Sequence, residues 1–507
     1  MSHIETRRGA SEGLVLERYW QSLSRPLRLP KAPPPPTVPS PGLSQPLDHP
    51  VSLSLRRLID DSQVEEDPAV LQAHAGGETY AGFLRRQRDG AGPQAIISPR
   101  TEQELVTIML WAAQRDIKIL PWGGGTAPYE GKSPSGAPFI VVKLGLMHRL
   151  LALNEEEHLV TMQAGATWQS TREIAERQDF TLAKSSLPGS STLGGTLATN
   201  TTDCRSSGYS ALTDDIARIR TITPAGPISL QGPASPAKNL LGLMLGSQGS
   251  WGIITEVALH LYQKPEKQAY LLANFPSRGA AMTALEEVSQ HQHHITAARL
   301  IDMAAIELFG SQNDQQRIFT PPAWLAPNSW KARLLLEITG SREAVVRTRR
   351  HAEEILRNHA ATIEGNGRAA HLKDGLWHHY RPLWRDLWLR GVMTYRLTSI
   401  VPWAILPSFR LAWEDALSSV LLSTSGVPGL PITTIHALKH HAQLDTLLLG
   451  HQVSGELTKK IQQLEAIQAV ATEINRRWNV AFEPTPLVSK ALSAARDALS
   501  LSNVMLQ

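Results

Sequence analysis

Pro121-Trp122-Gly123-Gly124-Gly125-Thr126 closes an apolar run, residues 117–121, that has the pattern of a β-strand. The three glycines have no side chains, so their backbone N–H groups can approach and surround a phosphate. No Gly-Lys-Ser/Thr follows them, which excludes a Walker loop, and the glycine spacing and acidic residue of the Rossmann fingerprint are missing. The loop therefore disfavours ATP and NAD, although a triple glycine alone is more often a flexible turn.

Two further glycine-rich segments follow along the chain. Residues 188–196 read PGSSTLGGT and lead into Ala198-Thr199-Asn200, which adds backbone donors and hydroxyl groups. Residues 246–256, GSQGSWGIITE, keep the backbone open before an apolar strand, as a flat ring packed along that backbone requires. One such loop is uninformative, whereas this ordered series predicts a nucleotide site whose phosphates are shared between the first two loops.

The residues before the first loop predict an α/β unit. AIISP (95–99) has the pattern of a short buried strand, and Thr101 with Glu104 matches the capping-box spacing that opens a helix. Apolar residues then recur at helical spacing, at Leu105, Ile108, Met109 and Ala112. A second strand, the glycine loop and the apolar run FIVVKL follow. This order is typical of units that cradle nucleotides.

The composition limits the class of protein. With 507 residues and 42% apolar side chains, the chain can bury a core large enough for more than one lobe. Basic and acidic residues alternate around a net charge of +4, so no nucleic-acid partner is predicted. The one cysteine, Cys204, excludes an internal disulfide and is expected to be a buried, inert thiol. Without a signal-peptide pattern or an apolar run of spanning length, a cytoplasmic protein with no membrane span is expected.

Five segments, in their order and spacing, resemble the FAD-binding domain of the p-cresol methylhydroxylase and vanillyl-alcohol oxidase family. They are ISPRTEQELVTIMLWAAQRDIKILPWGGGT, VTMQAGATW, SSTLGGTLATN, GYSALTDDI and LGSQGSWGIITEVAL, within residues 93–262. The resemblance implies an α+β fold in which two α/β subdomains hold FAD. It also implies a C-terminal cap domain with an antiparallel sheet flanked by helices.

The same resemblance implies which residues contact FAD. The first loop would lie against the pyrophosphate, the second would line its other side, and Ile254 would present its backbone to the flavin or the adenine. Asp214 stands where the family's motif has an aspartate after Tyr-Gly, although Tyr209 is followed here by Ser210. Thr126-Ala127 stands near the place where members that attach FAD covalently often have a histidine, so a dissociable FAD is expected. The full predicted set is Trp122, Gly123, Gly124, Gly125, Thr126, Ala127, Pro188, Ser191, Thr192, Gly194, Gly195, Thr199, Asp214, Gly249, Gly252, Ile253 and Ile254.

Within the family, the sequence looks most similar to the alkyldihydroxyacetonephosphate synthase-like and D-2-hydroxyacid dehydrogenase-like branches. HAGGETYAGFLRRQRDG (74–90) and MTYRLTSIVPW (393–403) resemble the synthase-like pattern. A His-His-His-Gly stretch helps to shape the active site in those relatives, whereas the matching residues 481–486 read AFEPTP. The ending ARDALSLSNVML (495–506) resembles the family's closing Asp-Pro-x-Asn-Ile segment, which supports this alignment. The missing histidines argue against synthase activity.

Oxidation of a hydroxyl compound by flavin needs a base for the hydroxyl proton and a cation for a carboxylate. Residues 435–441, IHALKHH, carry three histidines, and strand alternation predicts His436 and His440 on one face. Surface or satisfied histidines are the commoner explanation, and no acidic ligand stands at metal spacing, so no metal site is predicted. Arg396 lies where related enzymes turn a strand toward the flavin pocket and is a candidate substrate anchor. The aromatic and basic residues of 377–388 favour a packing face with a charged fringe.

The predicted organisation has four parts. Residues 1–50 form an N-terminal helix and a proline-rich strap, 51–264 the FAD-binding domain, 265–480 the cap, and 481–507 a segment that returns to the FAD-binding domain. The predicted function is an FAD-dependent oxidase or dehydrogenase of a small hydroxylated substrate, such as a 2-hydroxy acid or an alcohol. The alternatives are a flavin-binding subunit or scaffold without its own catalysis, and a synthase-like transferase. A homodimer and a partner subunit both stay open.

Overall fold

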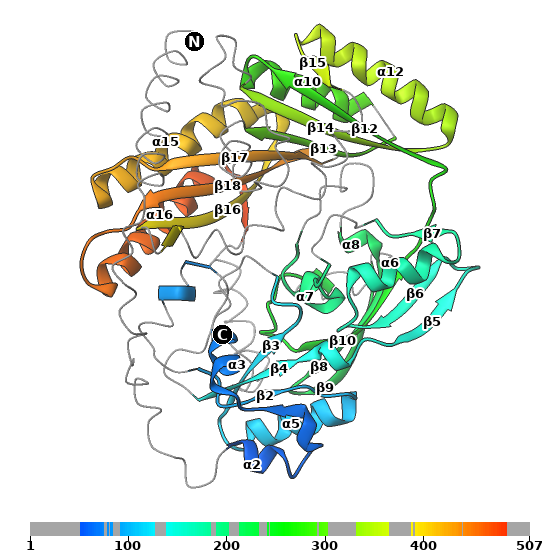
Figure 1. Cartoon of the computed structure of the whole chain (residues 1–507), viewed down its shortest axis with the longest axis vertical. Helices are drawn as coiled ribbons and strands as arrows, with labels where there is room; N and C mark the ends of the chain where they lie inside the picture. Colours follow the sequence, from blue (N-terminus) through cyan, green and yellow to red (C-terminus); the bar gives the residue numbers. More distant parts are fainter. Residues whose placement is uncertain are drawn as a thin grey trace, which may run out of the picture.

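The computed structural model divides the described part of the chain into two halves, which Figure 1 shows one above the other. The elements up to β11 form the lower half, and those from β12 onward form the upper half. The structure describes residues 51–75, 79–80, 82–84, 92–126, 138–183, 189–201, 212–232, 241–242, 244–291, 294–302, 331–364, 387–388, 391–438 and 440–483. Several predictions lie outside these residues: the 1–50 helix and strap, Ala127, Pro188, Cys204 and most of 377–388.

The first subdomain is a four-stranded sheet in the order β1-β2-β4-β3. Both β2 and β3 run parallel to β4, as the predicted α/β unit requires. The strands are β1 (Val64–Glu65), β2 (Ile96–Ile97), β3 (Lys118–Trp122) and β4 (Phe139–Lys143), with α2 (Val51–Leu55), η1 (Asp61–Gln63), α3 (Pro68–Ala73), α5 (Glu102–Ala113) and η2 (Leu144–Leu146) around them.

Helix α5 confirms the predicted helix start. Thr101 is its N-cap and accepts a hydrogen bond from the backbone N–H of Glu104, at 3.2 Å. The Glu104 carboxylate accepts from the N–H of Arg100 instead of that of Thr101, so only half of the capping box forms. The four apolar residues predicted for this helix, Leu105, Ile108, Met109 and Ala112, are all buried in the core under the sheet.

The second subdomain is a five-stranded antiparallel sheet in the order β5-β6-β10-β8-β9. An ion pair joins it to the first subdomain, because Arg220 of β8 contacts Glu102 of α5 at 2.9 Å. Its elements are β5 (Leu150–Asn154), β6 (Leu159–Gln163), α6 (Trp168–Glu176), β7 (Phe180–Thr181), α7 (Leu193–Ala198), α8 (Leu212–Asp215), β8 (Ile216–Thr223), β9 (Gly226–Gln231), β10 (Ile253–His260) and β11 (Tyr262–Gln263).

The upper half is built on one eight-stranded sheet, the cap sheet, in the order β15-β12-β14-β13-β17-β18-β16-β19. Every neighbouring pair is antiparallel, which confirms the predicted cap. Its strands are β12 (Lys267–Phe275), β13 (Ile295–Asp302), β14 (Ala332–Gly340), β15 (Thr362–Glu364), β16 (Val392–Pro402), β17 (Leu430–Ala437), β18 (His441–His451) and β19 (Ala481–Glu483).

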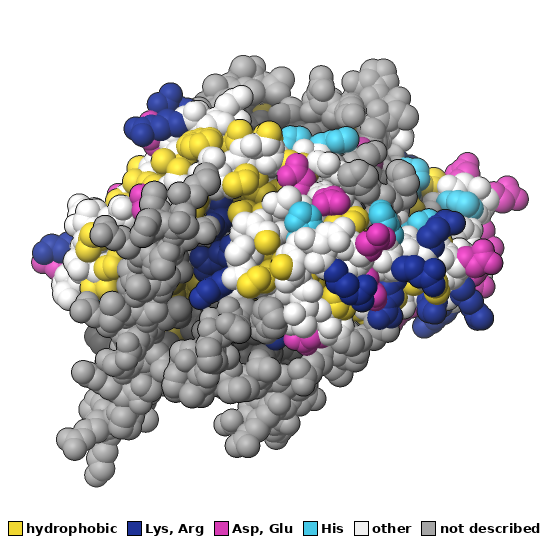
Figure 2. Space-filling view, turned by 90° about the horizontal axis from the view of Figure 1, so that it is seen from above, with side chains coloured by type: hydrophobic (Ala, Val, Ile, Leu, Met, Phe, Trp, Pro, Cys, Tyr) yellow, Lys and Arg dark blue, Asp and Glu magenta, His cyan; other side chains and the backbone are white. Residues whose placement is uncertain are grey.

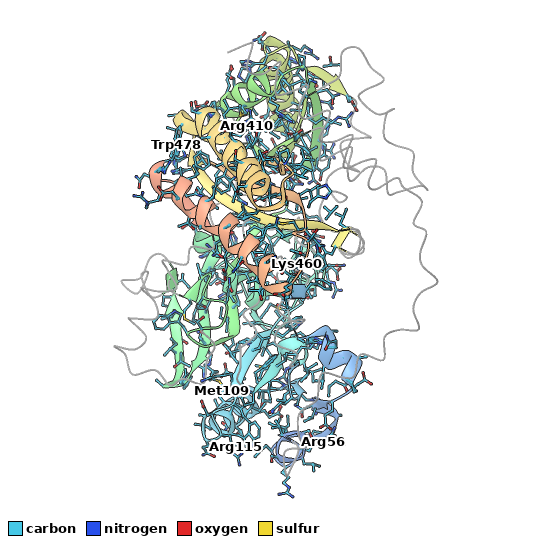
Figure 3. All side chains as sticks on the ribbon, turned by 90° about the vertical axis from the view of Figure 1, so that its left-hand side faces the viewer. Arg56, Met109, Arg115, Arg410, Lys460 and Trp478 are labelled. Atoms are coloured by element: carbon cyan, nitrogen blue, oxygen red, sulfur yellow. The ribbon has the colours of Figure 1, made fainter. Side chains whose placement is uncertain are left out.

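Helices pack on one face of the cap sheet. Alternate residues such as Leu300, Ile435 and Leu444 point into this apolar core. Figure 3 shows α15 and α16 side by side along the sheet, with Arg410 and Trp478 labelled. The helices are α10 (Arg278–His291), α12 (Arg342–Asn358), α15 (Leu406–Ser425, preceded by η5, Trp403–Ile405) and α16 (Leu457–Arg477). The intervening residues of the same strands must point to the opposite face.

Two details differ from the predicted domain limits. Strand β19 pairs with β16, so residues 481–483 extend the cap sheet and the predicted departure from the cap at residue 480 is wrong for these three. Tyr80 and Leu84, which precede the first subdomain's β2, are fully buried in the core of the cap. Tyr80 lies 6.1 Å from Trp388, ring centre to ring centre. The chain therefore leaves the first subdomain after α3, contributes these two residues to the core of the cap, and returns to the first subdomain at β2.

The surface agrees with the alternating charges of the sequence. On the face shown in Figure 2, the Lys and Arg side chains at the right of the view are mixed with Asp and Glu. Among the described helices, none is both long and apolar enough to cross a membrane.

Candidate active site

The first glycine loop leaves β3 and lies directly on the second loop. A Cβ on Gly123 would collide with the Thr192 hydroxyl oxygen, and one on Gly124 with the backbone carbonyl of Ser190. These two positions therefore require glycine for reasons of space. The two loops that are predicted to share the phosphates therefore lie in direct contact.

Two hydroxyl groups link the same loops. Thr126 Oγ1 and Ser191 Oγ lie 2.8 Å apart in a hydrogen bond. Thr192 is the N-cap of α7 and accepts from the backbone N–H of Gly195 at 3.2 Å. Thr199, one turn further, donates to the Gly195 carbonyl at 2.8 Å.

The third loop packs behind the first. A Cβ on Gly249 would lie 2.6 Å from Pro121 Cγ, and Gly249 has a φ of +84°, which disfavours any side chain. A Cβ on Gly252 would lie 2.6 Å from the Ile222 carbonyl oxygen. On the other side, the position of a Cβ on Gly194 lies 3.6 Å from the Ile254 carbonyl. The predicted residues of all three segments thus meet in one place.

We call this group the glycine cradle: Gly123, Gly124, Gly125, Thr126, Ser191, Thr192, Gly194, Gly195, Gly249, Gly252, Ile253 and Ile254. It fits the pyrophosphate and flat ring of FAD, because it offers glycine backbone and short hydroxyl side chains, and none of its residues carries a charge that would repel a phosphate. Trp122 borders it and packs its ring 4.7 Å from that of His74.

Asp214, which the family resemblance places among the FAD-contacting residues, lies on the short helix α8. It is exposed on α8, while the neighbouring Asp215 is buried and accepts a hydrogen bond from the Tyr262 hydroxyl at 2.7 Å. Buried Asp215 therefore ties α8 to β11. Nothing in the sequence distinguishes these two neighbouring aspartates.

The face of the cap sheet opposite the helices carries a second group of candidate site residues. Asp445 on β18 is 3% exposed. Its carboxylate accepts from Arg396 Nη2 at 2.9 Å, from Thr398 Oγ1 at 2.7 Å and from Gln443 Nε2 at 3.1 Å. We call this group, together with Arg299 and His436, the cap cluster.

His436 lies beside this carboxylate. Its Nε2 is 3.4 Å from Asp445 Oδ2, an ion-pair distance that is longer than a normal hydrogen bond. Arg299 of β13 stands directly opposite His436 in the strand register. Among the described residues, neither nitrogen of the His436 ring nor the Nε of Arg299 has a hydrogen-bond partner. Buried polar atoms of this kind are rare unless a site uses them.

The electrostatics of the cluster keep His436 neutral and Asp445 charged. Burial lowers the pKa of His436 below its ordinary value of 6.5, the nearby Arg299 and Arg396 lower it further, and Asp445 opposes this shift. Burial alone would raise the pKa of Asp445, but Arg396, His436 and Thr398 hold that pKa well below its ordinary value of 3.8. The cluster thus holds a neutral imidazole next to a carboxylate and two guanidinium groups.

His440 does not join this cluster, and the prediction that it shares a strand face with His436 is wrong. Strand β17 ends at Ala437, the chain turns, and β18 starts at His441. The turn closes with a hydrogen bond from the N–H of Leu438 to the carbonyl of His441, at 2.8 Å. His440 is exposed in this turn, because strand alternation stops where the strand stops.

Arg299 is the member of the cluster that the sequence interpretation missed. It is buried within a strand, ITAARLID, whose eight residues are all buried. Burial of a charged residue in such a strand costs free energy unless the residue is paired or takes part in a site. Arg299 could have been singled out from the sequence for this reason. No group of His, Cys, Asp and Glu suited to a metal ion occurs in the described part of the chain.

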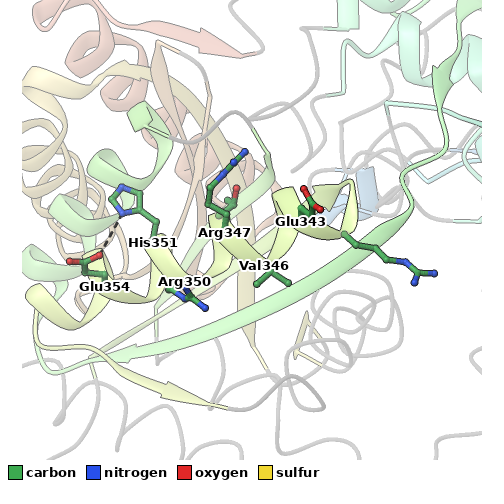
Figure 4. Close-up of a pocket in the computed structure, with 8 residues that line it drawn as sticks. Glu343, Val346, Arg347, Arg350, His351 and Glu354 are labelled. Atoms are coloured by element: carbon green, nitrogen blue, oxygen red, sulfur yellow. Dashed lines mark ion pairs between the residues drawn. The ribbon is translucent and has the colours of Figure 1, made fainter.

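A wide depression on α12 is separate from both groups. The residues that line it, among them Arg347, His351 and Glu354, all belong to that helix or its first turn (Figure 4). It brings together none of the predicted site residues.

Two family models match the chain one after the other. Residues 93–229 match an FAD binding domain, and residues 264–427 match the C-terminal domain of FAD linked oxidases. The chain therefore carries an FAD-binding domain followed by a domain of the kind found at the C-terminus of FAD linked oxidases. The glycine cradle lies in the first of these domains or just after it, and Arg299 and Arg396 lie in the second.

Among curated proteins, the chain is 27% identical over 281 residues to an alkyldihydroxyacetonephosphate synthase of Trypanosoma brucei brucei, covering 53% of this chain and 44% of the relative. It is 24% identical over 233 residues to a mitochondrial D-lactate dehydrogenase (cytochrome) of Arabidopsis thaliana, covering 45% and 41%. It is 28% identical over 272 residues to a glycolate oxidase subunit of Bacillus subtilis (strain 168), covering 52% and 55%. The chain thus spans about half the length of the curated relatives that it matches, or less.

Solved structures show the same fold. An alkyldihydroxyacetonephosphate synthase superposes with a TM-score of 0.72 at 21% identity, over 87% of this chain and 81% of the other. p-Cresol methylhydroxylase with bound substrate superposes with a TM-score of 0.62 at 12% identity, over 85% and 87%. The predicted fold and the predicted cofactor, FAD, are confirmed; the cytoplasmic location stays a prediction.

Proposed function

We propose that this chain oxidises a small hydroxy acid with FAD that is bound non-covalently. The observation that carries the proposal is the cap cluster, in which a buried neutral imidazole lies among two arginines and a carboxylate. Such a set supplies what the oxidation of a hydroxy acid needs, namely a proton acceptor for the hydroxyl group and a cation for the carboxylate.

Each residue of the cluster has a distinct task in this proposal. The substrate carboxylate lies against Arg299, whose Nε has no partner among the described residues. The hydroxyl proton passes to His436, and the adjacent Asp445 stabilises the imidazolium that forms. FAD, when bound, accepts the hydrogen of the carbinol carbon together with two electrons, so that the substrate becomes a 2-oxo acid. An external electron acceptor then takes these two electrons.

Arg396 changes its role relative to the sequence-based prediction. Its Nη2 lies 2.9 Å from Asp445 Oδ2, so this guanidinium already holds a carboxylate of the protein. In the proposal Arg396 acts through Asp445, and Arg299 takes the place of substrate anchor. The test is the comparison of Arg299→Lys with Arg396→Lys: the Arg299 variant should lose apparent affinity for the substrate more strongly.

The names of the relatives support the substrate class. The curated relatives include enzymes named for D-lactate, glycolate and D-2-hydroxyglutarate, the last from Xanthomonas citri pv. viticola at 27% identity over 231 residues. All three compounds carry a hydroxyl group next to a carboxylate. This shared feature is what Arg299 and His436 are suited to recognise.

A synthase-like transferase is the second candidate, because alkyldihydroxyacetonephosphate synthases are among the relatives by sequence and by fold. The segment at 481–486 has no histidine, however, whereas the synthase-like pattern has three. Incubation with acyl-dihydroxyacetone phosphate and a long-chain alcohol decides between the two: we expect no exchange, and exchange at a catalytic rate would favour the transferase.

The cofactor attachment and the reaction are tested in sequence. Acid precipitation of the yellow protein should release the flavin into the supernatant, because no histidine stands next to the first loop. The holoprotein is then mixed anaerobically with a panel of 2-hydroxy acids, and the flavin absorbance is followed. Bleaching by at least one of them is the expected result. A flavin that dithionite reduces and no hydroxy acid or alcohol reduces would favour a binding subunit without its own catalysis.

A further inference from the structure

The Asp445 carboxylate is the centre of the hydrogen bonds in the cap cluster. Three donors reach its carboxylate, Arg396 and Thr398 from β16 and Gln443 from its own strand. All three distances lie between 2.7 and 3.1 Å, the normal range for hydrogen bonds. Thr398 and Gln443 donate to Oδ1, while Arg396 donates to Oδ2, the oxygen that also faces His436.

The strand register fixes this geometry. Asp445 stands opposite Thr398 on one side and Thr434 on the other, and His436 stands opposite Gln443. His436 and Thr434 are two residues apart on β17, so they project to the same face as Asp445. Because the partners sit on paired strands and not on loops, the backbone ladder holds them in place.

We propose that Asp445 is a positioning residue that holds the proton of His436 on Nε2 and so makes Nδ1 the proton-accepting atom of the site. A carboxylate 3.4 Å from Nε2 favours a hydrogen on that nitrogen and disfavours a bare lone pair there. The lone pair of the neutral ring is then left on Nδ1, which is buried and has no partner among the described residues. The assignment rests on the proposed function, since it names the atom that would take the hydroxyl proton.

The charged groups around His436 are consistent with this arrangement. Arg299 faces it from β13, Asp445 from β18 and Arg396 from β16. Burial and the two arginines lower the pKa of His436, so the ring is neutral at neutral pH and has a lone pair to offer. Asp445 opposes that shift, so it stabilises the imidazolium that forms when the ring takes up the proton.

A second buried carboxylate in the cap provides a matched control. Glu414 of α15 lies on the helix-covered side of the sheet and accepts two hydrogen bonds from Arg410 Nη1, both at 2.9 Å. Its side chain is 8% exposed, close to the 3% of Asp445. Asp445→Asn and Glu414→Gln therefore remove the same charge from two buried, arginine-paired carboxylates, and only the first of these contacts His436.

The first arm of the test measures the tautomer without any substrate. Protein labelled with ¹⁵N-histidine is examined by NMR, and His436→Gln identifies the signal among the 18 histidines. We expect a neutral ring with its proton on Nε2 in the wild type and in Glu414→Gln, and a shift toward the Nδ1-protonated form in Asp445→Asn. A proton on Nδ1 in the wild type, or an unchanged tautomer in Asp445→Asn, would overturn the inference.

The second arm measures the reductive step. Asp445→Asn should lower the rate constant of flavin reduction at saturating hydroxy acid by about 100- to 10,000-fold, with unchanged FAD content. Asp445→Glu should restore part of the rate, and Glu414→Gln should keep it. Equal losses in Asp445→Asn and Glu414→Gln would reduce Asp445 to a structural role. If no hydroxy acid reduces the wild type, the proposed function fails, and the tautomer still decides the role of Asp445.

Discussion

The glycine cradle and the cap cluster are assembled in different ways. The cradle is made of loops that require glycine, because a Cβ at Gly123 or Gly124 has no room. The cap cluster is made of polar and charged side chains on strands. Its members come from four strands that pair side by side. Cofactor binding therefore depends on local backbone shape, whereas the proposed chemistry depends on long-range strand pairing.

The largest expected effect comes from filling the cradle. Gly124→Ala places a methyl group onto the Ser190 carbonyl, so the two loops must separate and the pyrophosphate site is lost. We expect protein purified from this variant to contain little or no FAD, as measured by its visible absorption. Gly145→Ala is the control, because a Cβ there meets nothing within 4 Å. Full FAD content in Gly124→Ala would remove the cradle from the cofactor site.

His436→Ala should separate chemistry from cofactor binding. The cap cluster loses its proton acceptor, so flavin reduction by a hydroxy acid should slow by about 100- to 10,000-fold, while FAD content stays unchanged. Rapid anaerobic mixing measures the rate constant. His440→Ala, in the exposed turn, serves as the matched control and should react like the wild type. A His436→Ala variant that keeps its rate would exclude this residue as the base.

The pH dependence of stability tests whether the cap cluster holds His436 neutral. The pKa of His436 is lowered in the folded chain, so between that value and 6.5 the unfolded chain binds more protons. Stability should therefore fall as the pH drops below 6.5, and His436→Gln should show a weaker fall. Thermal unfolding at a series of pH values between 7 and 5 measures both curves. Identical slopes would mean that His436 is not held neutral.

The smallest expected effect concerns the hydrogen bond between the first two loops. Ser191→Ala removes the partner that lies 2.8 Å from Thr126 Oγ1. FAD affinity should fall severalfold, the equivalent of about 0.5–1.5 kcal/mol. Titration of apoprotein with FAD measures this change, and Ser289→Ala, whose hydroxyl donates only within α10, is the control. Equal affinities for wild type and Ser191→Ala would show that this hydrogen bond does not shape the cradle.

Much of the fold could be predicted from the sequence, because its signals are local. The glycines of the first loop, the cap at Thr101 and the apolar spacing of α5 act within a few residues of each other. The cap cluster was only partly predictable, because which residues face Asp445 is set by pairing between β16, β17 and β18. His436 was predicted, Arg299 was missed, and His440 was wrongly included because the end of β17 was not visible in the sequence.

The most direct test of the central claim compares two ligands that differ only in the hydroxyl group. The holoprotein is titrated anaerobically with a 2-hydroxy acid that the panel has identified and with the matching carboxylic acid that lacks the hydroxyl. We predict that both perturb the flavin absorption spectrum, through the carboxylate at Arg299, and that only the hydroxy acid bleaches it. Bleaching that His436→Ala leaves unchanged, or no spectral response to either ligand, would contradict a hydroxy-acid site on the cap sheet.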